Sequence, residues 1–381
     1  MCGPLSSFTK EVRDLPEKVW LPKWMWEGVE DFARKFKFHQ IDWLRNILRL
    51  PRAGWYSTVT TFAGRETLSP STSLRIIQGR ILTQLQSLPV SSAAHAYLQG
   101  RSIISNAEPH RNSRSILCLD LADAFGQACL NAELEEFGFE NVRLLWLIRY
   151  FCELDLPEMD YVKPSVIRIS SNTRKLPQGA LTSPAIFNHF MLQVDDKLLR
   201  LAAHVGGVYT RYADNIFFSM PEPHMSQKLV RAIKRQLHYV FPDPNQGDRI
   251  YRSPWKKWVP LSFDLVLNQS KTRLVQDANR HDRPLPLCGL NIVAGELHIR
   301  QTTLRRQRAA IWAGLKSNNF SLVASCLGYV KMIYGDDLPR QISQMFEKAG
   351  YDPENPSSWY VNLGERPPMN LGTLQYMLHL E

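Results

Sequence analysis

Two aspartates lie where their carboxylates could hold a cation. Asp120 ends the apolar run at residues 115–121, and Asp214 lies where two short apolar runs meet within 208–219. Carboxylates at neighbouring strand ends repel each other unless a cation lies between them. Mg²⁺ suits that position, because it takes one or two carboxylates and leaves its other positions to water and phosphate oxygens. Two such ions about 4 Å apart are the arrangement used for phosphoryl transfer onto a 3′-hydroxyl of nucleic acid.

The same two residues also have a purely structural interpretation. Asp-Asn is common turn chemistry, because Asn tolerates positive φ, so residues 214–215 are consistent with a plain hairpin turn. A lone Asp after a strand is usually a helix cap. Spacing alone leaves both interpretations open.

The elements that must position these residues can be predicted from apolar spacing. Helical patterns cover residues 1 to about 50, 73–88, 131–137 and 141–153, and the run at 115–121 predicts a buried strand. Ser183-Pro184 is a strong helix start, with a hydroxyl N-cap and a proline at the first helical position. We expect that helix to pass Leu199 and end before Gly206.

Two further segments complete the predicted organisation. Residues 208–219 predict two short strands that meet at Asp214-Asn215, and the four prolines within 241–260 predict a surface loop. The stretch 298–335 contains no Asp or Glu but six Lys or Arg residues. A basic helix is usually a solvated face, and the complete lack of acids weakens that interpretation here.

Composition narrows the class of protein. With 44% hydrophobic and 22% charged residues, the chain is neither disordered nor a disulfide scaffold. Its 46 basic and 36 acidic residues give a net charge of +10, which favours a polyanionic partner, above all nucleic acid. The six cysteines are scattered, so we expect reduced thiols and no structural zinc. No apolar run approaches a membrane span and no secretory signal is recognisable, so we predict a cytoplasmic protein.

Several short motifs occur in a characteristic order. LDLADAF (119–125), LPQGALTSP (176–184) and RYADN (211–215) resemble the three central palm motifs of reverse transcriptases. NQSKTR (268–273) resembles the lysine-bearing motif of that family, and CGLNI (288–292) its primer-grip hairpin. Upstream, GRSIISNAEPH (100–110) is similar to an element of bacterial retron-type enzymes. The resemblance covers roughly residues 60–315, and the joint order is far more specific than any single motif.

The resemblance implies a catalytic group. Asp120 and Asp214 would hold two Mg²⁺ ions, with the main-chain carbonyl of Leu121 as a further ligand, and Mn²⁺ is an alternative metal. Asn215 would stand beside them in place of the second aspartate of the family pattern. Lys271 would protonate or neutralise the pyrophosphate leaving group.

It also implies a nucleotide pocket. Asp123, Ala124 and Phe125 would line the pocket, and Phe125 would be the steric gate that excludes a ribose 2′-hydroxyl and so favours dNTPs. Gln178 would contact the nucleotide, and Arg65 would grip the triphosphate, for which a planar bidentate donor is well suited. Taken singly, Arg65 and Lys271 are more often solvated cations, and Phe125 a core aromatic residue.

The implied architecture is an α+β right-hand polymerase with fingers, a palm containing an antiparallel sheet, and a helical thumb. We expect a helical N-terminal extension at 1–55, fingers and palm at 56–296, and the thumb with a C-terminal segment at 297–381. The thumb would follow the backbone of the duplex by phosphate contacts. The nucleic-acid-binding candidates there are Arg300, Arg305, Arg306 and Arg308.

The implied function is RNA-directed DNA synthesis. The chain resembles defence-associated bacterial enzymes, which in turn resemble retrons. By that resemblance it would copy a dedicated noncoding RNA into DNA and protect against phage. A second protein encoded nearby, or further copies of the chain in an oligomer, would be its partners. Asn215 departs from the usual second aspartate, and we hypothesise that activity survives with an altered preference between Mg²⁺ and Mn²⁺. The alternatives are a catalytically weak RNA-binding protein and template-independent or protein-primed DNA synthesis. Phe125 argues against an RNA polymerase.

Two acidic pairs resemble catalytic motifs but lack their context. YGDDLPR (334–340) follows a helical stretch and has no apolar strand after it, so we reject it as a catalytic hairpin. Asp195-Asp196 lies within the helix that follows Pro184, and we interpret it as surface charge. His110 is expected to be a hydrogen-bonded core residue or an RNA contact rather than a metal ligand.

Overall fold

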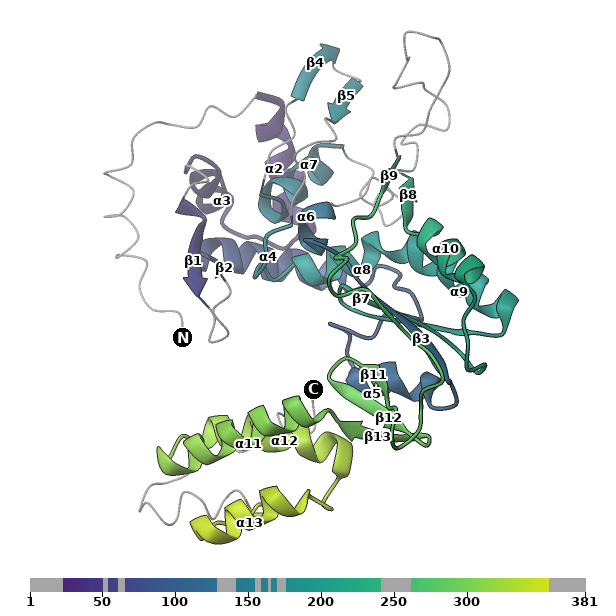
Figure 1. Cartoon of the computed structure of the whole chain (residues 1–381). Coiled ribbons are helices and arrows are strands. Elements are labelled where there is room, and N and C mark those ends of the chain that lie inside the picture. The colour runs from purple at the N-terminus through teal and green to yellow at the C-terminus, as the bar shows by residue number, and fades with distance from the viewer. Residues whose placement is uncertain are drawn as a thin grey trace. The chain divides into compact units, whose positions relative to one another are not determined.

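Strand β3 (Ser115–Asp120) is formed by six consecutive residues that are all buried. An almost wholly apolar run is typical of a strand covered on both faces, and the predicted strand is confirmed. β3 lies inside a four-stranded antiparallel sheet with the order β10-β3-β7-β6 (Figure 1). The other three strands are β6 (Val208–Tyr212), β7 (Asn215–Met220) and β10 (Arg273–Val275).

The computed structural model describes residues 23–50, 54–60, 66–128, 142–154, 159–163, 166–169, 176–240 and 262–355. The predictions for 1–22, 131–137 and 241–260 lie outside these residues. The chain divides into two compact units that interleave along the sequence. Unit 1 comprises Met1–Ser91, Ala122–Asp196 and Leu237–Val266, and unit 2 comprises Ser92–Leu121, Lys197–Gln236 and Leu267–Glu381. The three-part division at residues 55 and 296 stays a prediction.

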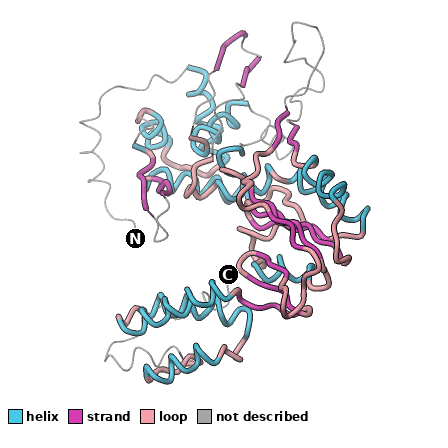
Figure 2. Tube along the Cα trace, viewed as in Figure 1, coloured by secondary structure: helices cyan, strands magenta, loops and turns pink. Residues whose placement is uncertain are grey.

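Unit 2 contains the four-stranded sheet, a second antiparallel sheet and a group of helices near the C-terminus, shown in magenta and cyan in Figure 2. Helices α11 and α12 run side by side (Figure 1). The remaining elements of unit 2 are α5 (Ile103–Ala107), the 3₁₀ helix η3 (Glu108–His110), α10 (Gln227–Arg235), β11 (Leu285–Leu287), β12 (Leu290–Val293), β13 (Glu296–Ile299), α11 (Gln301–Lys316), α12 (Phe320–Tyr334) and α13 (Arg340–Ala349).

One hydrophobic core joins these parts of unit 2. Ile116 and Phe217 of the four-stranded sheet belong to the same buried cluster as Leu290 of β12 and Leu327 of α12. Gly314 on α11 allows close packing, because a Cβ there would lie 2.7 Å from a methyl group of Val323 on α12. The predicted helices of the basic stretch are therefore confirmed, and they share a core with the sheet.

A buried polar network lies within unit 2. The imidazole of His110 is fully buried and contacts Ser219 Oγ through Nδ1 at 2.6 Å and Thr210 Oγ1 through Nε2 at 2.8 Å. Ser113 Oγ lies 2.7 Å from Ser219 Oγ. Burial, and then the charge of His95, lower the pKa of His110 from 6.5 to about 3, so the ring is neutral at physiological pH. His110 is thus a hydrogen-bonded core residue, one of the two roles expected for it.

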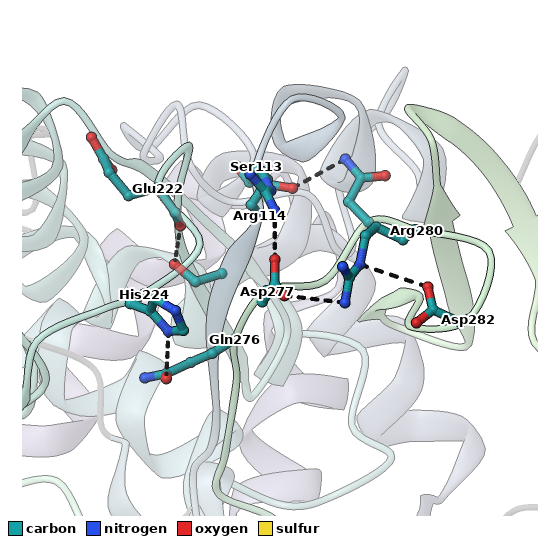
Figure 3. Close-up of polar contacts among 10 residues, drawn as sticks. Ser113, Arg114, Glu222, His224, Gln276, Asp277, Arg280 and Asp282 are labelled. Atoms are coloured by element: carbon teal, nitrogen blue, oxygen red, sulfur yellow. Dashed lines mark hydrogen bonds and ion pairs between the residues drawn. The ribbon is translucent and has the colours of Figure 1, made fainter.

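Ion pairs connect the start of β3 to the segment that follows β10, at the end of the sheet opposite Asp120 (Figure 3). Arg114, which precedes β3, pairs with Asp277, and Asp277 also pairs with Arg280 at 3.1 Å. Main-chain bonds reinforce the link, since the Ala278 N–H donates to the Arg114 carbonyl at 2.7 Å. The pairs are half exposed, so each contributes at most about 1 kcal/mol, and their role is to fix where the segment after β10 lies.

Unit 1 consists of helices and three two-stranded sheets. Its elements are α2 (Lys23–Lys35), α3 (Ile41–Leu48), β1 (Tyr56–Thr60), β2 (Glu66–Pro70), α4 (Thr72–Leu85), α6 (Ala124–Gln127), α7 (Val142–Cys152), β4 (Met159–Lys163), β5 (Val166–Ile169), α8 (Ser183–Phe190), β8 (His238–Val240) and β9 (Ser262–Asp264). Helix α9 (Leu192–Val205) continues from unit 1 into unit 2.

Aromatic side chains form the core of unit 1. Phe151 of α7 lies 5.4 Å from Phe32 of α2 and stacks on Trp55 at 5.4 Å, measured between ring centroids. The buried amide of Gln78 on α4 donates to the Phe151 carbonyl at 2.9 Å and to the Tyr56 hydroxyl at 2.8 Å. The predicted helices at 73–88 and 141–153 are confirmed, as is the helical character of residues 23–48.

The predicted helix start at Ser183-Pro184 is only partly right. Thr182 takes the N-cap position without a side-chain cap bond, and Ser183 Oγ instead donates to the Pro177 carbonyl at 2.8 Å. The helical stretch is also interrupted at Met191, which separates α8 from α9. Its end at Val205, before Gly206, agrees with the prediction.

The two rejected acidic pairs have different outcomes. Residues 335–339 connect α12 to α13, with Gly335 at φ 60°, so no strand follows the pair and the rejection is confirmed. Asp195, however, is fully buried, so its interpretation as surface charge was wrong. It lies in the first turn of α9, where the helix dipole favours a negative charge. Its neighbour Asp196 is exposed.

The fold class is α+β, as predicted. Helices make up much of both units, and the sheets are built from antiparallel pairs. Within the described ranges, no helix is both long enough and apolar enough to cross a membrane.

Candidate active site

The ends of strands β3 and β7 in unit 2 bring the predicted catalytic residues together. Asp120, the last residue of β3, pairs directly with Asn215, the first residue of β7. Beyond this pair, the Leu121 N–H donates to the Asp214 carbonyl at 3.0 Å. The Asp120 side chain is only 7% exposed. Asp120 and Asp214 therefore lie at the same end of the sheet, Asp120 at the end of β3 and Asp214 in the turn that leads into β7.

The turn that carries Asp214 differs from the predicted one. Tyr212 pairs with Asn215, so the two turn residues are Ala213 and Asp214 rather than 214–215. Positive φ falls on Ala213, at 55°, where glycine is the usual residue, while Asn215 is already part of the strand. Asn215 Nδ2 instead donates to Asp214 Oδ1 at 3.0 Å. Asn215 therefore acts on the neighbouring carboxylate and not as a turn former.

The buried guanidinium of Arg211 supports this turn through a hydrogen bond. Arg211 of β6 is fully buried, and its Nη1 donates to the Ala213 carbonyl at 3.1 Å. A charge is costly to bury unless it is hydrogen-bonded. The hydrogen bond to the Ala213 carbonyl satisfies one donor of the buried guanidinium. It also fixes Ala213, the residue with positive φ that precedes Asp214.

Lys271 lies at the same strand end. Its Nζ is 3.1 Å from Asp120 Oδ2, and its side chain is 53% exposed. The preceding turn is organised by Asn268, whose N–H donates to the Asp120 carbonyl at 2.8 Å. The Asn268 carbonyl in turn accepts the N–H groups of Lys271 and Thr272 at 3.2 and 3.1 Å. The lysine thus has a fixed backbone and a side chain that reaches solvent.

The donors at this strand end fit a divalent cation. The oxygens available there are two carboxylates, the amide oxygen of Asn215 and the main-chain carbonyl of Leu121, and oxygen ligands are what Mg²⁺ and Mn²⁺ prefer. No group of three or more His, Cys, Asp or Glu side chains that could hold a metal occurs in the described part of the chain. A metal here would therefore need further oxygens from water or a phosphate.

The predicted nucleotide residues at 123–125 belong to unit 1. Asp123 is exposed and left-handed, with φ 44° and ψ 52°, and it precedes α6 at the N-cap position. Ala124 is buried. Phe125 is half-buried, and its ring lies 5.2 Å from the ring of Phe187 on α8. A ring supported from behind and still partly exposed suits a steric wall better than a fully packed core position.

The loop that carries Gln178 is also fixed within unit 1. Gln178 is exposed, while its carbonyl accepts the Leu68 N–H of β2 at 2.7 Å. Gly179 has φ 115° and lies so close to the Leu68 carbonyl that a side chain would collide with it. The Leu181 N–H donates to the buried Gln78 side chain at 3.3 Å. The Gln178 side chain therefore extends from a rigid loop.

The other predicted site residues have mixed surroundings. Arg65 lies outside the described residues. Arg305 and Arg306 of α11 are exposed, as nucleic-acid contacts require. Arg308 is half-buried and donates to Gln341 of α13. Arg300 is half-buried before α11, and burial followed by the charge of Arg273 lowers its pKa.

Three positioning residues were not singled out from the sequence: Arg211, Asn268 and Gln78. Arg211 and Asn268 lie inside motifs that were recognised, but their function depends on contacts with Ala213 and Asp120 that only the fold provides. For Gln78 one signal was available, because it is a polar residue on the apolar face of a predicted helix. A polar residue at a core position requires buried partners.

Comparison with known proteins agrees with the residue-level picture. Residues 65–241 match the family of reverse transcriptases (RNA-dependent DNA polymerases). The chain is 32% identical over 173 residues to the retron Mx162 reverse transcriptase of Myxococcus xanthus, which covers 43% of this chain and 36% of that relative. It is 25% identical over 301 residues to the retron Ec86 reverse transcriptase of Escherichia coli, covering 76% and 79%. The chain thus spans about a third of the first of these relatives and most of the second.

Solved structures add a distant likeness. Apo telomerase from Candida tropicalis, truncated from its C-terminal domain, has a TM-score of 0.37 and 11% identity, over 65% of this chain and 55% of that one. The fold assignment does not depend on this likeness. It rests on the matched residues, the order of the motifs and the strand-end geometry. Over residues 65–241 the chain is similar to the reverse transcriptase family, and the relatives that it resembles are reverse transcriptases of bacterial retrons.

Proposed function

We propose that the protein is an RNA-directed DNA polymerase that extends a DNA strand by nucleotidyl transfer at the end of β3 and β7. The observation that carries this proposal is the direct pairing of Asp120 with Asn215, together with the 3.0 Å main-chain bond from Leu121 to Asp214. These two contacts support a site in which Asp120, at the end of β3, is close to Asp214 in the turn before β7. The match of residues 65–241 to the family supports the same chemistry.

The reaction joins the 3′-hydroxyl of the growing strand to the α-phosphorus of a dNTP. The new O–P bond forms as the bond to pyrophosphate breaks, and the hydroxyl proton leaves to solvent or a nearby base. Asp120 and Asp214, with the Leu121 carbonyl, would hold divalent cations. When bound there, such cations would supply an acidified 3′-hydroxyl and stabilisation of the charge on the phosphoryl oxygens. The role of the protein is to fix the two carboxylates, and Arg211 and Asn215 support that role through Ala213 and Asp214.

Lys271 is the proposed partner of the leaving group. Its ammonium lies 3.1 Å from Asp120 Oδ2, yet half of the side chain is exposed. The ammonium can therefore turn from the carboxylate to a pyrophosphate oxygen while the Asn268 turn holds the backbone. A cation that neutralises or protonates pyrophosphate lowers the barrier to its departure.

The proposed nucleotide pocket is formed by unit 1 residues. Phe125, supported by Phe187, would stand against the sugar and exclude a 2′-hydroxyl, while Gln178 would contact the nucleotide from its rigid loop. Asp123 and Ala124 would complete the pocket floor, and Arg65 would bind the triphosphate. Exposed Arg305 and Arg306 would contact phosphates of the duplex.

The proposed template is a dedicated noncoding RNA, and the proposed biological role is antiphage defence. Similarity to several retron reverse transcriptases supports the RNA template, and the net charge of +10 supports a nucleic-acid partner. The defence role is an analogy between families. A second protein and self-association belong to the same analogy.

Primer extension tests the proposed polymerase activity. The full chain would be given an RNA template with an annealed DNA primer, the four dNTPs and Mg²⁺ or Mn²⁺. We expect extension by the parent chain and loss of at least about a thousandfold in Asp214→Asn, which keeps the size of the side chain but removes the metal-binding charge. Extension that Asp214→Asn and Asp120→Asn leave intact would refute the assignment of the site.

The alternative functions give different results in the same assay. A catalytically weak RNA-binding protein would bind the primed RNA but not extend it in either metal. Template-independent synthesis would extend the primer with no dependence on the sequence of the RNA. Each of these outcomes contradicts RNA-directed synthesis.

A further inference from the structure

The segment at residues 92–101 runs beside the edge strand β6 in unit 2. Ala94 and Arg211 form a parallel β-bridge, in which the Arg211 N–H donates to the Ala93 carbonyl at 2.7 Å and the His95 N–H donates to the Arg211 carbonyl at 2.9 Å. Both chains run in the same direction. The bridge is isolated, so the two chains part after it: β6 ends at Tyr212 and leads into the turn with Asp214, while the other segment continues to Tyr97.

Further hydrogen bonds fix the conformation of this segment. The Arg101 guanidinium donates to the Ser92 carbonyl at 2.8 Å and also to the Ala94 carbonyl. The His95 ring contacts Ser105 Oγ at 2.8 Å, and Ser102 caps α5 with a complete capping box. The segment is therefore held at both ends and along its edge, as a rigid loop rather than a mobile one.

Tyr97 is unusual within this rigid loop. Its backbone is left-handed, with φ 63°, a conformation that aromatic residues rarely adopt. Its side chain is 57% exposed, the second-largest exposed fraction among the large hydrophobic residues of the described chain. Strained, exposed residues in a fixed framework are concentrated at functional sites.

The electrostatic surroundings of Tyr97 agree with a segment that runs beside β6. Partial burial raises the pKa of the Tyr97 phenol, the negative charge of Asp214 raises it further, and Arg211 acts in the opposite direction. Both charged residues belong to the hairpin that carries the candidate catalytic carboxylate. Tyr97 thus follows, by two residues, the His95 N–H that is bonded to this hairpin.

We propose that Tyr97 is a stacking platform for the base of the 3′-terminal nucleotide of the growing DNA strand. The inference rests on the proposed function, since it assumes that the 3′-hydroxyl approaches Asp214. An exposed aromatic ring on a rigid segment that is bonded to the Asp214 hairpin would then meet the terminal nucleotide. Stacking on an aromatic ring tolerates every base, which a polymerase that copies any sequence requires.

Fluorescence of 2-aminopurine tests the platform. The full chain would bind an RNA template annealed to a DNA primer that ends in a dideoxy form of 2-aminopurine, so that no extension occurs. A second duplex would carry 2-aminopurine at the first unpaired template position. We expect the parent chain and Tyr97→Phe to quench the primer-terminal base, because both keep the ring. In Tyr97→Ala the quenching should be lost and the Kd for the duplex should rise about 5- to 150-fold.

Gln99→Ala is the matched control, because it removes an exposed side chain from the same loop without removing an aromatic ring. It should quench and bind like the parent chain. Equal thermal stability of the variants would show that the loop remains folded.

Three results would overturn the platform. The first is unchanged quenching in Tyr97→Ala. The second is a Tyr97→Phe variant that behaves like Tyr97→Ala, which would make the hydroxyl the important group. The third is a Tyr97-dependent signal from the template base instead of the primer end. These results can be told apart from a failure of the proposed function. In that case the parent chain would not extend a primer with a free 3′-hydroxyl, whereas the quenching assay needs no turnover.

Discussion

Asn215 changes the electrostatics of the proposed metal site by one charge. Its side-chain amide donates to Asp214 Oδ1 at 3.0 Å. An aspartate at position 215 would instead bring a second negative charge next to the Asp214 carboxylate. The amide N–H therefore gives this carboxylate oxygen a hydrogen-bond partner without a metal. It also offers a metal a neutral oxygen in place of a charged one. The site should therefore keep its geometry and bind divalent cations less tightly than a site with two adjacent aspartates.

Asn215→Asp should therefore strengthen metal binding. One added charge about 4 Å from a divalent ion contributes roughly 1–2 kcal/mol in a water-like dielectric, so half-maximal Mg²⁺ should fall about fivefold or more. The ratio of activity in Mg²⁺ to that in Mn²⁺ should change as well. Titration of primer extension with each metal measures both effects, with Asn215→Ala as the control that removes the hydrogen bond and adds no charge. Identical titrations for the parent chain and Asn215→Asp would contradict this interpretation.

Phe125 provides a second test at the scale of one residue. Its ring is half-buried and supported by Phe187 at 5.2 Å, as a fixed steric wall requires. Phe125→Ala should raise the incorporation of ribonucleotides relative to deoxynucleotides by about tenfold or more, because the clash with the 2′-hydroxyl is removed. Competition between rNTP and dNTP in primer extension measures the ratio. If it is the same in Phe125→Ala and in the conservative Phe125→Tyr, the gate assignment is wrong.

At the scale of the element, the turn at residues 268–272 positions Lys271. The Asn268 N–H binds the carbonyl of Asp120, and its own carbonyl accepts the N–H groups of Lys271 and Thr272. Its side-chain oxygen also accepts the Ser270 hydroxyl at 2.7 Å. The turn is therefore built on one residue and joined directly to the end of β3.

Asn268→Ala should reduce catalysis through Lys271. The main-chain bonds survive the substitution, but the bond to Ser270 is removed and the turn loosens. We expect kcat to fall about tenfold, with little change in the KM for dNTP, because misplaced groups lower turnover more than binding. In a Lys271→Ala background the same substitution should have almost no further effect. Full additivity of the two substitutions would mean that Asn268 stabilises the fold without positioning the lysine.

Particular elements show what could be predicted from the sequence. Strand β3 and helix α4 were predicted because their apolar patterns are local and regular. The hairpin turn was misplaced by one residue, because Ala213 takes the left-handed conformation that local chemistry assigns to Asn, and buried Arg211 supports it. Asp195 was assigned to the surface because helical position alone does not reveal which neighbours cover a side chain.

The sequence predicts the residues of the candidate site more completely than it predicts the contacts that support them. The motifs assigned Asp120, Asp214 and Lys271 to one catalytic group, and the structure brings these residues together at the end of β3. Their supports could not be predicted, since Asn268 and Arg211 act through contacts with residues in other segments. Tyr97 has no local signal either, because its position follows from a parallel bridge between distant parts of the chain.

For the whole molecule, the buried His110 links stability to pH. Its pKa is about 3 in the folded protein and 6.5 as the ordinary value, so below pH 6.5 the unfolded chain binds a proton that the folded chain does not. The free energy of unfolding should therefore fall as the pH drops from 6.5 toward 3, by up to about 1.4 kcal/mol per pH unit from this residue. His95, with a pKa lowered to about 4, acts in the same direction.

Chemical denaturation at several pH values measures this dependence. His110→Gln should flatten the slope between pH 6 and 4 by close to one proton, whereas His204→Gln, at an exposed position of α9, should leave it unchanged. An unchanged slope in His110→Gln would mean that the imidazole is not neutral in the fold.

The net charge of +10 predicts a salt-dependent affinity for nucleic acid. Arg305 and Arg306 are exposed on α11, in a stretch without acids. Replacing both with alanine should reduce the slope of log Kd against log salt by about one unit for each phosphate that the variant no longer binds, and the effect should not depend on sequence. Arg235→Ala, at an exposed position of α10, is the matched control. A slope that matches the parent chain would exclude α11 from the nucleic-acid interface.

The most direct test of RNA-directed synthesis is to sequence the RNA and DNA that copurify with the protein from cells, with and without Asp214→Ala. We predict one defined noncoding RNA in both preparations, and DNA complementary to it only with the parent chain. RNA in both preparations and DNA in neither would contradict polymerase activity. DNA without a matching RNA would contradict the RNA template and indicate untemplated or protein-directed synthesis.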